Sequence, residues 1–219
     1  MKIRSIMVVS AVFALGACAS MTPTFQTESA YLILDVKGNN INRGALLDSI
    51  TNAVKGNMSS VTVSRDIPPA TLPEQPARFV LKDITAGSNL GAMLQSRGYS
   101  SKVPVCDGQI LTLASRDTSM GQYGQSASFN LCVIPYKAGY QVDIYATTQQ
   151  STGGFSTATL GATISKSLVG DIGQFIPRTM NDVKKAMEAT GGKVSVVDSY
   201  IPDSFKGPLV NQTAELLTK

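Results

Sequence analysis

Residues 126–150 read SASFNLCVIPYKAGYQVDIYATTQQ. Two runs in this stretch, residues 126–134 and 140–150, have the apolar and polar alternation of strands, and the turn YKAG lies between them. The second run divides its residues between an apolar and a polar face, with Val142, Ile144 and Ala146 on the first and Gln141, Asp143 and Tyr145 on the second. The stretch therefore predicts two consecutive strands of a sheet.

Two helices are predicted to carry apolar stripes. In the first, residues 40–57, Asn40 or Asn42 is a candidate N-cap and Gly56 suits the C-terminal end. Its stripe comprises Ile41, Ala45, Leu46, Ile50, Ala53 and Val54. The second begins near Asp171, with Pro177 forcing a kink or a restart. Its stripe comprises Ile172, Phe175, Ile176, Met180, Val183 and Met187.

The remaining elements complete a mixed fold. We expect strands at residues 30–38, 60–64, 77–84, 109–117 and 193–200, and shorter helical segments at 89–98, 157–168 and 213–219. This order predicts an α+β fold, in which a mainly antiparallel β-sheet has helices packed on one face.

The N-terminus has the pattern of an export signal. Lys2 and Arg4 precede an uncharged, mostly apolar run from Ser5 to Ala17. A membrane-spanning helix needs about 20 apolar residues, so this run of roughly 13 is too short to span. Small residues at its end lead into a cysteine, in the order Leu15-Gly16-Ala17-Cys18.

The sequence LGAC at residues 15–18 resembles the lipobox of bacterial lipoproteins. The resemblance implies that residues 1–17 are a cleaved signal peptide and that Cys18 carries a diacylglycerol and an N-acyl chain. Ala19, in place of Asp, implies an outer-membrane location. Residues 18–29 would then be a tether and residues 30–219 a single periplasmic domain, whose element order loosely resembles helix-grip domains of some envelope lipoproteins. The alternative is an ordinary secretory signal with a coincidental cysteine.

Removal of the signal peptide leaves little net charge. Without Lys2 and Arg4, the chain has 17 basic and 15 acidic side chains. The densest basic pair is Lys184-Lys185, and no longer run of Lys or Arg occurs. Because nucleic-acid binding depends on a concentrated basic patch, we expect no nucleic-acid partner.

The two remaining cysteines predict a disulfide. The predicted strands 109–117 and 126–134 would form an antiparallel hairpin, in which the residue numbers of paired positions have a constant sum. A turn centred between Met120 and Gly121 sets this sum at 241, and the sum for Cys106 and Cys132 is 238. They therefore fall within a few positions of each other, and a bulge or loop could bring them together. An even pair in an oxidising compartment favours a bridge. A redox pair or a metal site is disfavoured, because the chain has no C-x-x-C and no histidine.

Exclusion of the common catalytic motifs predicts a non-catalytic protein without metal or cofactor. The absence of histidine removes Ser-His-Asp and Cys-His chemistry. Neither Ser-x-x-Lys, G-x-S-x-G, G-x-G-x-x-G nor a P-loop occurs. Carboxylate chemistry remains open, although no spacing pairs two of the available acids, which are Asp35, Asp83, Asp107, Asp117, Asp143, Asp171 and Glu188.

Three segments are candidate contact loops for a partner. Residues 66–79, DIPPATLPEQPARF, contain Pro68, Pro69, Pro73 and Pro76 and read as a rigid surface connector or a docking segment. Residues 115–125 include Tyr123, and residues 147–157 include Phe155. Each is also explained as a turn or a connection without any partner.

Two functions remain. The first is an outer-membrane lipoprotein, anchored by its lipid and facing the periplasm, that acts as a non-catalytic accessory or scaffold in an envelope protein assembly. The second is a periplasmic binding module for an apolar or peptidoglycan-derived ligand. A binding module should have a deep cavity lined by the helix stripes, whereas a scaffold should have a solid core and an exposed apolar patch.

Overall fold

The computed structural model describes residues 24–38, 40–58, 60–83, 88–96, 102–118, 125–152 and 175–206. Its strands and helices are β1 Thr24–Lys37, α1 Arg43–Asn57, β2 Thr62–Arg65, β3 Val80–Asp83, α2 Asn89–Ser96, β4 Lys102–Val105, β5 Leu111–Asp117, β6 Gln125–Tyr136, β7 Gly139–Thr152, α4 Phe175–Glu188, β8 Lys193–Tyr200 and α5 Asp203–Lys206.

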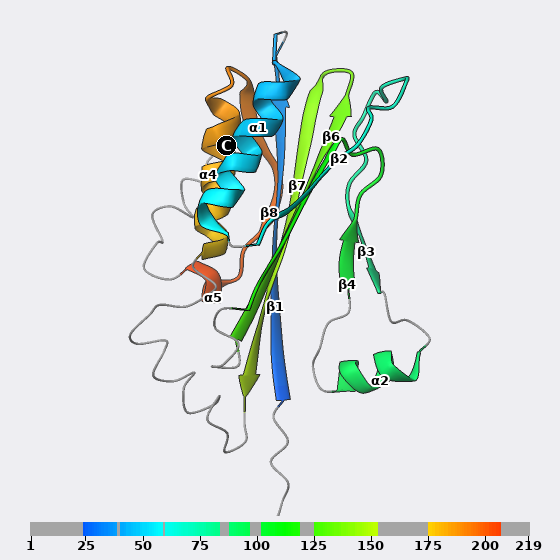
Figure 1. Ribbon diagram of the computed structural model, residues 1–219, viewed down its shortest axis with the longest axis vertical. Coiled ribbons are helices and arrows are strands. Elements are labelled where there is room, and N and C mark those ends of the chain that lie inside the picture. The colour runs from blue at the N-terminus through cyan, green and yellow to red at the C-terminus, as the bar shows by residue number, and fades with distance from the viewer. Residues whose placement is uncertain are drawn as a thin grey trace, which may run out of the picture.

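Six strands form one antiparallel sheet in the order β2-β5-β6-β7-β1-β8. Helices α1 and α4 lie beside each other on one face of this sheet (Figure 1). The predicted α+β class is therefore confirmed, including the mainly antiparallel strands and the helices on one face. We call the opposite face of the sheet the outer face.

The core fills the space between the sheet and the two helices. Alternate side chains of the central strands, among them Leu32, Leu131 and Ile144, have no exposed surface, and Ile50 of α1 and Met180 of α4 are equally buried. Each such side chain contributes about 1.5–3 kcal/mol when it is fully buried. The apolar face predicted for residues 140–150 is part of this core.

Two predicted boundaries differ from the structure, and one of the two candidate N-caps of α1 is confirmed. Strand β1 begins at Thr24, so residues 24–29, expected in the tether, pair with β7 instead. Asn42 rather than Asn40 caps α1, because its Oδ1 accepts a hydrogen bond of 3.1 Å from the Ala45 nitrogen. Gly56 does not end α1, which continues to Asn57. The chain then turns into an extended conformation at Met58, whose side chain is buried.

The stripes predicted for the helices are mostly buried, but Ala45 of α1 and Phe175 of α4 are exposed, and Ile172 lies outside the described residues. Ala45 is exposed because the buried side of α1 includes Leu47 and Thr51, and Ala45 lies outside it. Pro177 lies in the first turn of α4, where a missing amide hydrogen leaves no hydrogen bond unmade. The helix predicted over residues 157–168 lies outside the described residues.

A second sheet of two strands, β3 and β4, stands apart from the first. Residues 77–84 were predicted to form a strand, and β3 occupies part of that range. Figure 1 shows β3, β4 and α2 together at one side of the main sheet. We call these three elements the arm, and we call residues 66–79, which lead into it, the strap.

Candidate interaction site on the outer face

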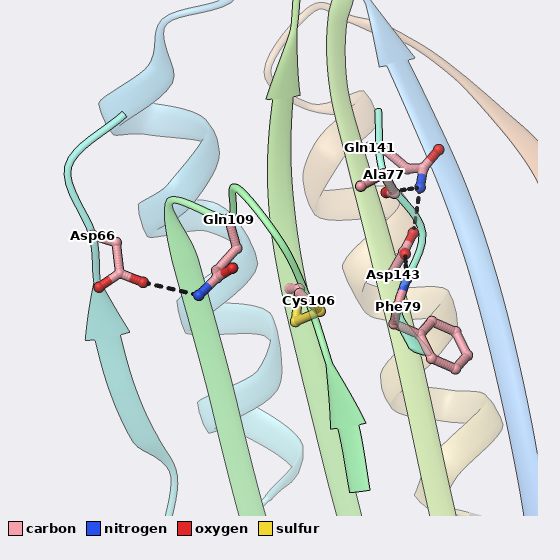
Figure 2. Close-up of a disulfide and its surroundings, with 8 residues drawn as sticks. Asp66, Ala77, Phe79, Cys106, Gln109, Gln141 and Asp143 are labelled. Atoms are coloured by element: carbon pink, nitrogen blue, oxygen red, sulfur yellow. Dashed lines mark hydrogen bonds between the residues drawn. A yellow bond between two sulfur atoms is a disulfide. The ribbon is translucent and has the colours of Figure 1, made fainter. Parts of the chain in front are cut away.

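The strap is held on the outer face by hydrogen bonds with β7 and with the turn between β6 and β7. The Lys137 nitrogen donates to the Pro73 carbonyl at 3.0 Å, and the Gln141 Nε2 donates to the Ala77 carbonyl at 3.1 Å. At the end of the strap, the Phe79 nitrogen donates to Asp143 Oδ2 at 2.8 Å (Figure 2). The strap is therefore a docked segment with its own bonding pattern.

Asp143 is the buried centre of this contact. Its Oδ1 accepts a second hydrogen bond, 2.8 Å from Gln141 Nε2, so both carboxylate oxygens have partners (Figure 2). Burial raises the pKa of Asp143, and the hydrogen bonds from Phe79 and Gln141 together with the Arg78 charge offset only part of that increase. The carboxylate is therefore retained at an electrostatic cost, in a position where it fixes the strap.

Aromatic and charged contacts extend the docking of the strap. The Phe79 ring lies 6.3 Å from Tyr31 in an edge-on arrangement and 5.7 Å from Tyr145, measured between ring centroids. Such pairs contribute about 0.5–1.5 kcal/mol beyond the area that they bury. Arg78 forms an ion pair with Asp198 of β8 at 3.2 Å. The end of the strap thus contacts β1, β7 and β8 together.

A second buried carboxylate on the outer face is Asp35 of β1. The Tyr136 hydroxyl donates to Asp35 Oδ1 at 2.7 Å, and Lys37 Nζ lies 3.1 Å from Asp35 Oδ2. Burial raises the pKa of Tyr136, and the Asp35 hydrogen bond and charge raise it further. The phenol therefore stays protonated and donates. Both Asp35 and Asp143, considered from sequence as free acids, have their oxygens occupied by protein groups.

The Cys106–Cys132 disulfide is present, with an S–S distance of 2.0 Å and a Cα–Cα distance of 6.5 Å. The register predicted for it was wrong. Cys132 of β6 is opposite Thr112, so paired positions sum to 244 rather than 241, and Cys106 lies between β4 and β5. The chain reverses beyond Cys106, at Gly108 with φ +70°. The bridge consequently ties the base of the arm to the main sheet.

The arm carries a concentration of exposed apolar side chains. Val80 and Val105 are directly opposite each other in the β3–β4 pair, so their side chains lie on the same face, and both are exposed. We call these two residues the arm patch. Leu81 of β3 and Met93 of α2 are also exposed. Clustered apolar surface of this kind is typical of an interaction site.

The residues predicted as partner contacts fall in different places. Pro68 and Pro76 are half-buried, whereas Pro69 and Pro73 are exposed, all in the strap. Tyr123, Phe155 and Cys18 lie outside the described residues. The sequence reasoning did not identify the arm patch or the role of Asp143. The alternation of residues 140–150 places Asp143 on a polar face, so the sequence contains no local signal that the strap buries it.

Within the described ranges, no group of three or more acidic or cysteine side chains is arranged to bind a metal ion. None of the described helices combines the length and apolar character that a membrane crossing requires. Comparison with protein-family models and with curated proteins finds no match to this chain.

Proposed function

We propose that this protein is a lipid-anchored lipoprotein of the outer membrane, facing the periplasm, that acts as a non-catalytic scaffold in an envelope protein assembly. The anchor is proposed from the LGAC motif at residues 15–18. The scaffold role is proposed from one observation, the contrast between a filled core and an exposed arm patch.

The filled core favours a scaffold over a binding module. A ligand between sheet and helices would need the apolar stripes of α1 and α4 to line an open space. Instead, Leu46, Ile50 and Val54 of α1 have no exposed surface, and the same holds for Met180 and Val183 of α4. These side chains belong to one cluster with those of the sheet, so side chains of the protein itself fill the described core.

The arm patch is the surface that we assign to a protein partner. Val80 and Val105 lie on a two-stranded sheet that the disulfide and the strap attach to the main sheet. Both attachments are at the base of the arm, where the chain enters β3 and leaves β4 next to the patch. They fix the position of the patch before a partner binds, which lowers the entropic cost of binding. An apolar partner surface would remove both valines from water.

Site-specific photocrosslinking in intact cells tests the scaffold role. A photoreactive residue at Val80 should give an adduct with one envelope protein, and the same protein should be captured from Val105. Val197 of β8 is a matched control, because it is also a strand valine and its exposed fraction of 46% is close to the 59% of Val80. Val80→Asp should abolish the adduct formed from Val105. Capture of only lipid or glycan at both arm positions would refute a protein scaffold.

The anchor has a separate test. Palmitate labelling should be lost in Cys18→Ser and retained in Cys106→Ser, since only Cys18 follows the lipobox. Labelling that persists in Cys18→Ser would refute the anchor.

A further inference from the structure

We infer that α2, at the tip of the arm, docks onto the lipid surface in which the anchor is inserted. This inference rests on the proposed lipid anchor at Cys18. It adds a second contact with the membrane and an orientation of the whole domain, with the long axis of the sheet directed away from the bilayer.

The short chain between the anchor and the sheet determines which end of the molecule is near the membrane. Thr24, the first residue of β1, follows Cys18 by six positions. Six residues span at most about 21 Å even when fully extended. The start of β1 pairs with the end of β7, where Thr24 is opposite Thr152. This end of the sheet must therefore lie within about 21 Å of the anchored cysteine.

Helix α2 lies at this same end. Figure 1 shows the start of β1, the end of β7 and α2 at one end of the long axis, with the β6–β7 hairpin at the other. The hairpin end is distant, because β1 runs 14 residues from Thr24 to Lys37, opposite Gly139. At about 3.4 Å per residue, the two ends of β1 are about 44 Å apart. An anchor at Cys18 thus brings α2, and not the hairpin, to the bilayer surface.

The chemistry of α2 fits a lipid surface. Its sequence, NLGAMLQS, contains no charged residue. Gln95 Nε2 donates to Asp83 Oδ2 at 2.7 Å, which turns this side of the helix towards β3. Met93 is two positions earlier and so about 200° around the helix, on the side directed away from β3. It has an exposed fraction of 49%. A helix with one apolar and one polar side can lie in the headgroup region, with its apolar side towards the acyl chains.

The charges at the base of the helix also fit. Lys82 and Lys102, both exposed, are on the strands that lead to and from α2, and Asp83 is the one acidic residue on those two strands. The surroundings of α2 therefore have a net positive charge, which favours a membrane that contains anionic lipids.

Tryptophan fluorescence tests the inference directly, because the native chain contains no tryptophan. Met93→Trp in the acylated full chain places a single fluorophore on α2. The protein is reconstituted in vesicles of phosphatidylethanolamine and phosphatidylglycerol, with and without bromine on the phosphatidylglycerol acyl chains. Insertion to the depth of interfacial helices, about 5–10 Å, should reduce the fluorescence in the brominated vesicles relative to the unbrominated ones.

Ile67→Trp provides the matched control. Ile67 is 92% exposed, and the register places it at the hairpin end. Arg65 is opposite Leu111, which is itself opposite Val133, three residues before β6 ends. The fluorescence of the Ile67→Trp variant should be the same in vesicles with and without bromine.

Each other result overturns a defined part of the inference. Equal quenching of the two variants would contradict the end-on orientation. Acylated Met93→Trp protein without quenching would refute docking of α2 and leave the anchor intact. Shielding of this tryptophan from aqueous iodide without quenching by bromine would refute lipid docking and assign α2 to a contact with this chain or with a second copy of it. Absence of acylation would instead refute the proposed function itself.

Discussion

Asp143 shows how one charged residue can organise a surface. It lies in the centre of β7, opposite Ile33 of β1 and Cys132 of β6, among buried side chains. A neutral residue would avoid the cost of desolvating a carboxylate. The carboxylate nevertheless provides two acceptors at the place where the strap ends, for the Phe79 amide and for Gln141. We interpret Asp143 as the residue that fixes the register of the strap.

Asp143→Asn should reveal the cost of this buried charge. Burial raises the pKa of Asp143 in the folded protein, so the folded state binds the proton more tightly than the unfolded state. The contribution of protonated Asp143 to stability is complete below the unfolded pKa of about 3.9 and is lost as the pH rises through the folded value. Wild type should therefore lose free energy of unfolding relative to Asp143→Asn as the pH rises above the unfolded pKa of about 3.9.

Urea unfolding at several pH values measures this difference. Asp66→Asn, at an exposed position of the strap, changes the net charge equally and controls for general charge effects. A difference between wild type and Asp143→Asn that stays constant, or that moves in favour of wild type as the pH rises, would contradict the burial argument.

Two glycines should respond to alanine in opposite directions. A Cβ at Gly139 would lie 2.1 Å from the Val36 carbonyl oxygen, a backbone atom that cannot move without disturbing the β1–β7 ladder. Gly139→Ala should therefore cost on the order of 1–3 kcal/mol of unfolding free energy. Gly56, inside α1, has no atom within 4 Å of an added Cβ. Gly56→Ala should stabilise by about 0.5–1 kcal/mol. Thermal unfolding of the two variants provides the comparison, and equal shifts would refute it.

Among the elements, those with a strong periodic pattern were predictable from the sequence and those fixed by distant contacts were not. The strands at residues 126–134, 140–150 and 193–200 and the helix that α1 forms follow from alternation and apolar stripes. The first six residues of β1 are mostly polar, and only their pairing with β7 makes them a strand. The chain reversal after Cys106 has a local signal in the turn pair Asp107-Gly108. The position of the arm beside the main sheet depends on distant contacts that no local pattern specifies.

The candidate site was predictable only in part, for the same reason. The disulfide followed from the cysteine count and the expected compartment, although the expected hairpin register did not hold. The strap was recognised as proline-rich, but its docking depends on Gln141 and Asp143, which are more than 60 residues further along the chain. A single sequence contains no signal for contacts of that separation.

Removal of the disulfide should weaken the arm more than the main sheet. The bridge closes a loop with a sequence separation of 26 residues. The loop-entropy relation assigns such a bridge about 3.5 kcal/mol, which the Cys106→Ala/Cys132→Ala variant should lose. Urea unfolding with and without reductant measures this, because reductant should destabilise the wild type and leave the variant unchanged. A variant as stable as the oxidised wild type would contradict a structural role for the bridge.

The whole molecule combines two parts of different stability. The main sheet has interior strands covered by helices, whereas the arm has two strands of four residues each with mostly exposed side chains. Short two-stranded sheets are marginally stable alone. Hydrogen exchange should therefore be faster at the amides of β3 and β4 than at those of β1, β6 and β7. Equal protection in the two sheets would show that they unfold as one unit.

The sheet order also constrains the time at which this protein can fold. Strand β1 is made first, yet it pairs with β7 and β8, which begin at Gly139 and Lys193. Until most of the chain has been synthesised, residues 24–37 have no ladder to join. Contacts between such distant segments form slowly. The growing polypeptide therefore cannot complete this sheet through most of translation, and the apolar side chains of β1 stay without their partner strands over that interval.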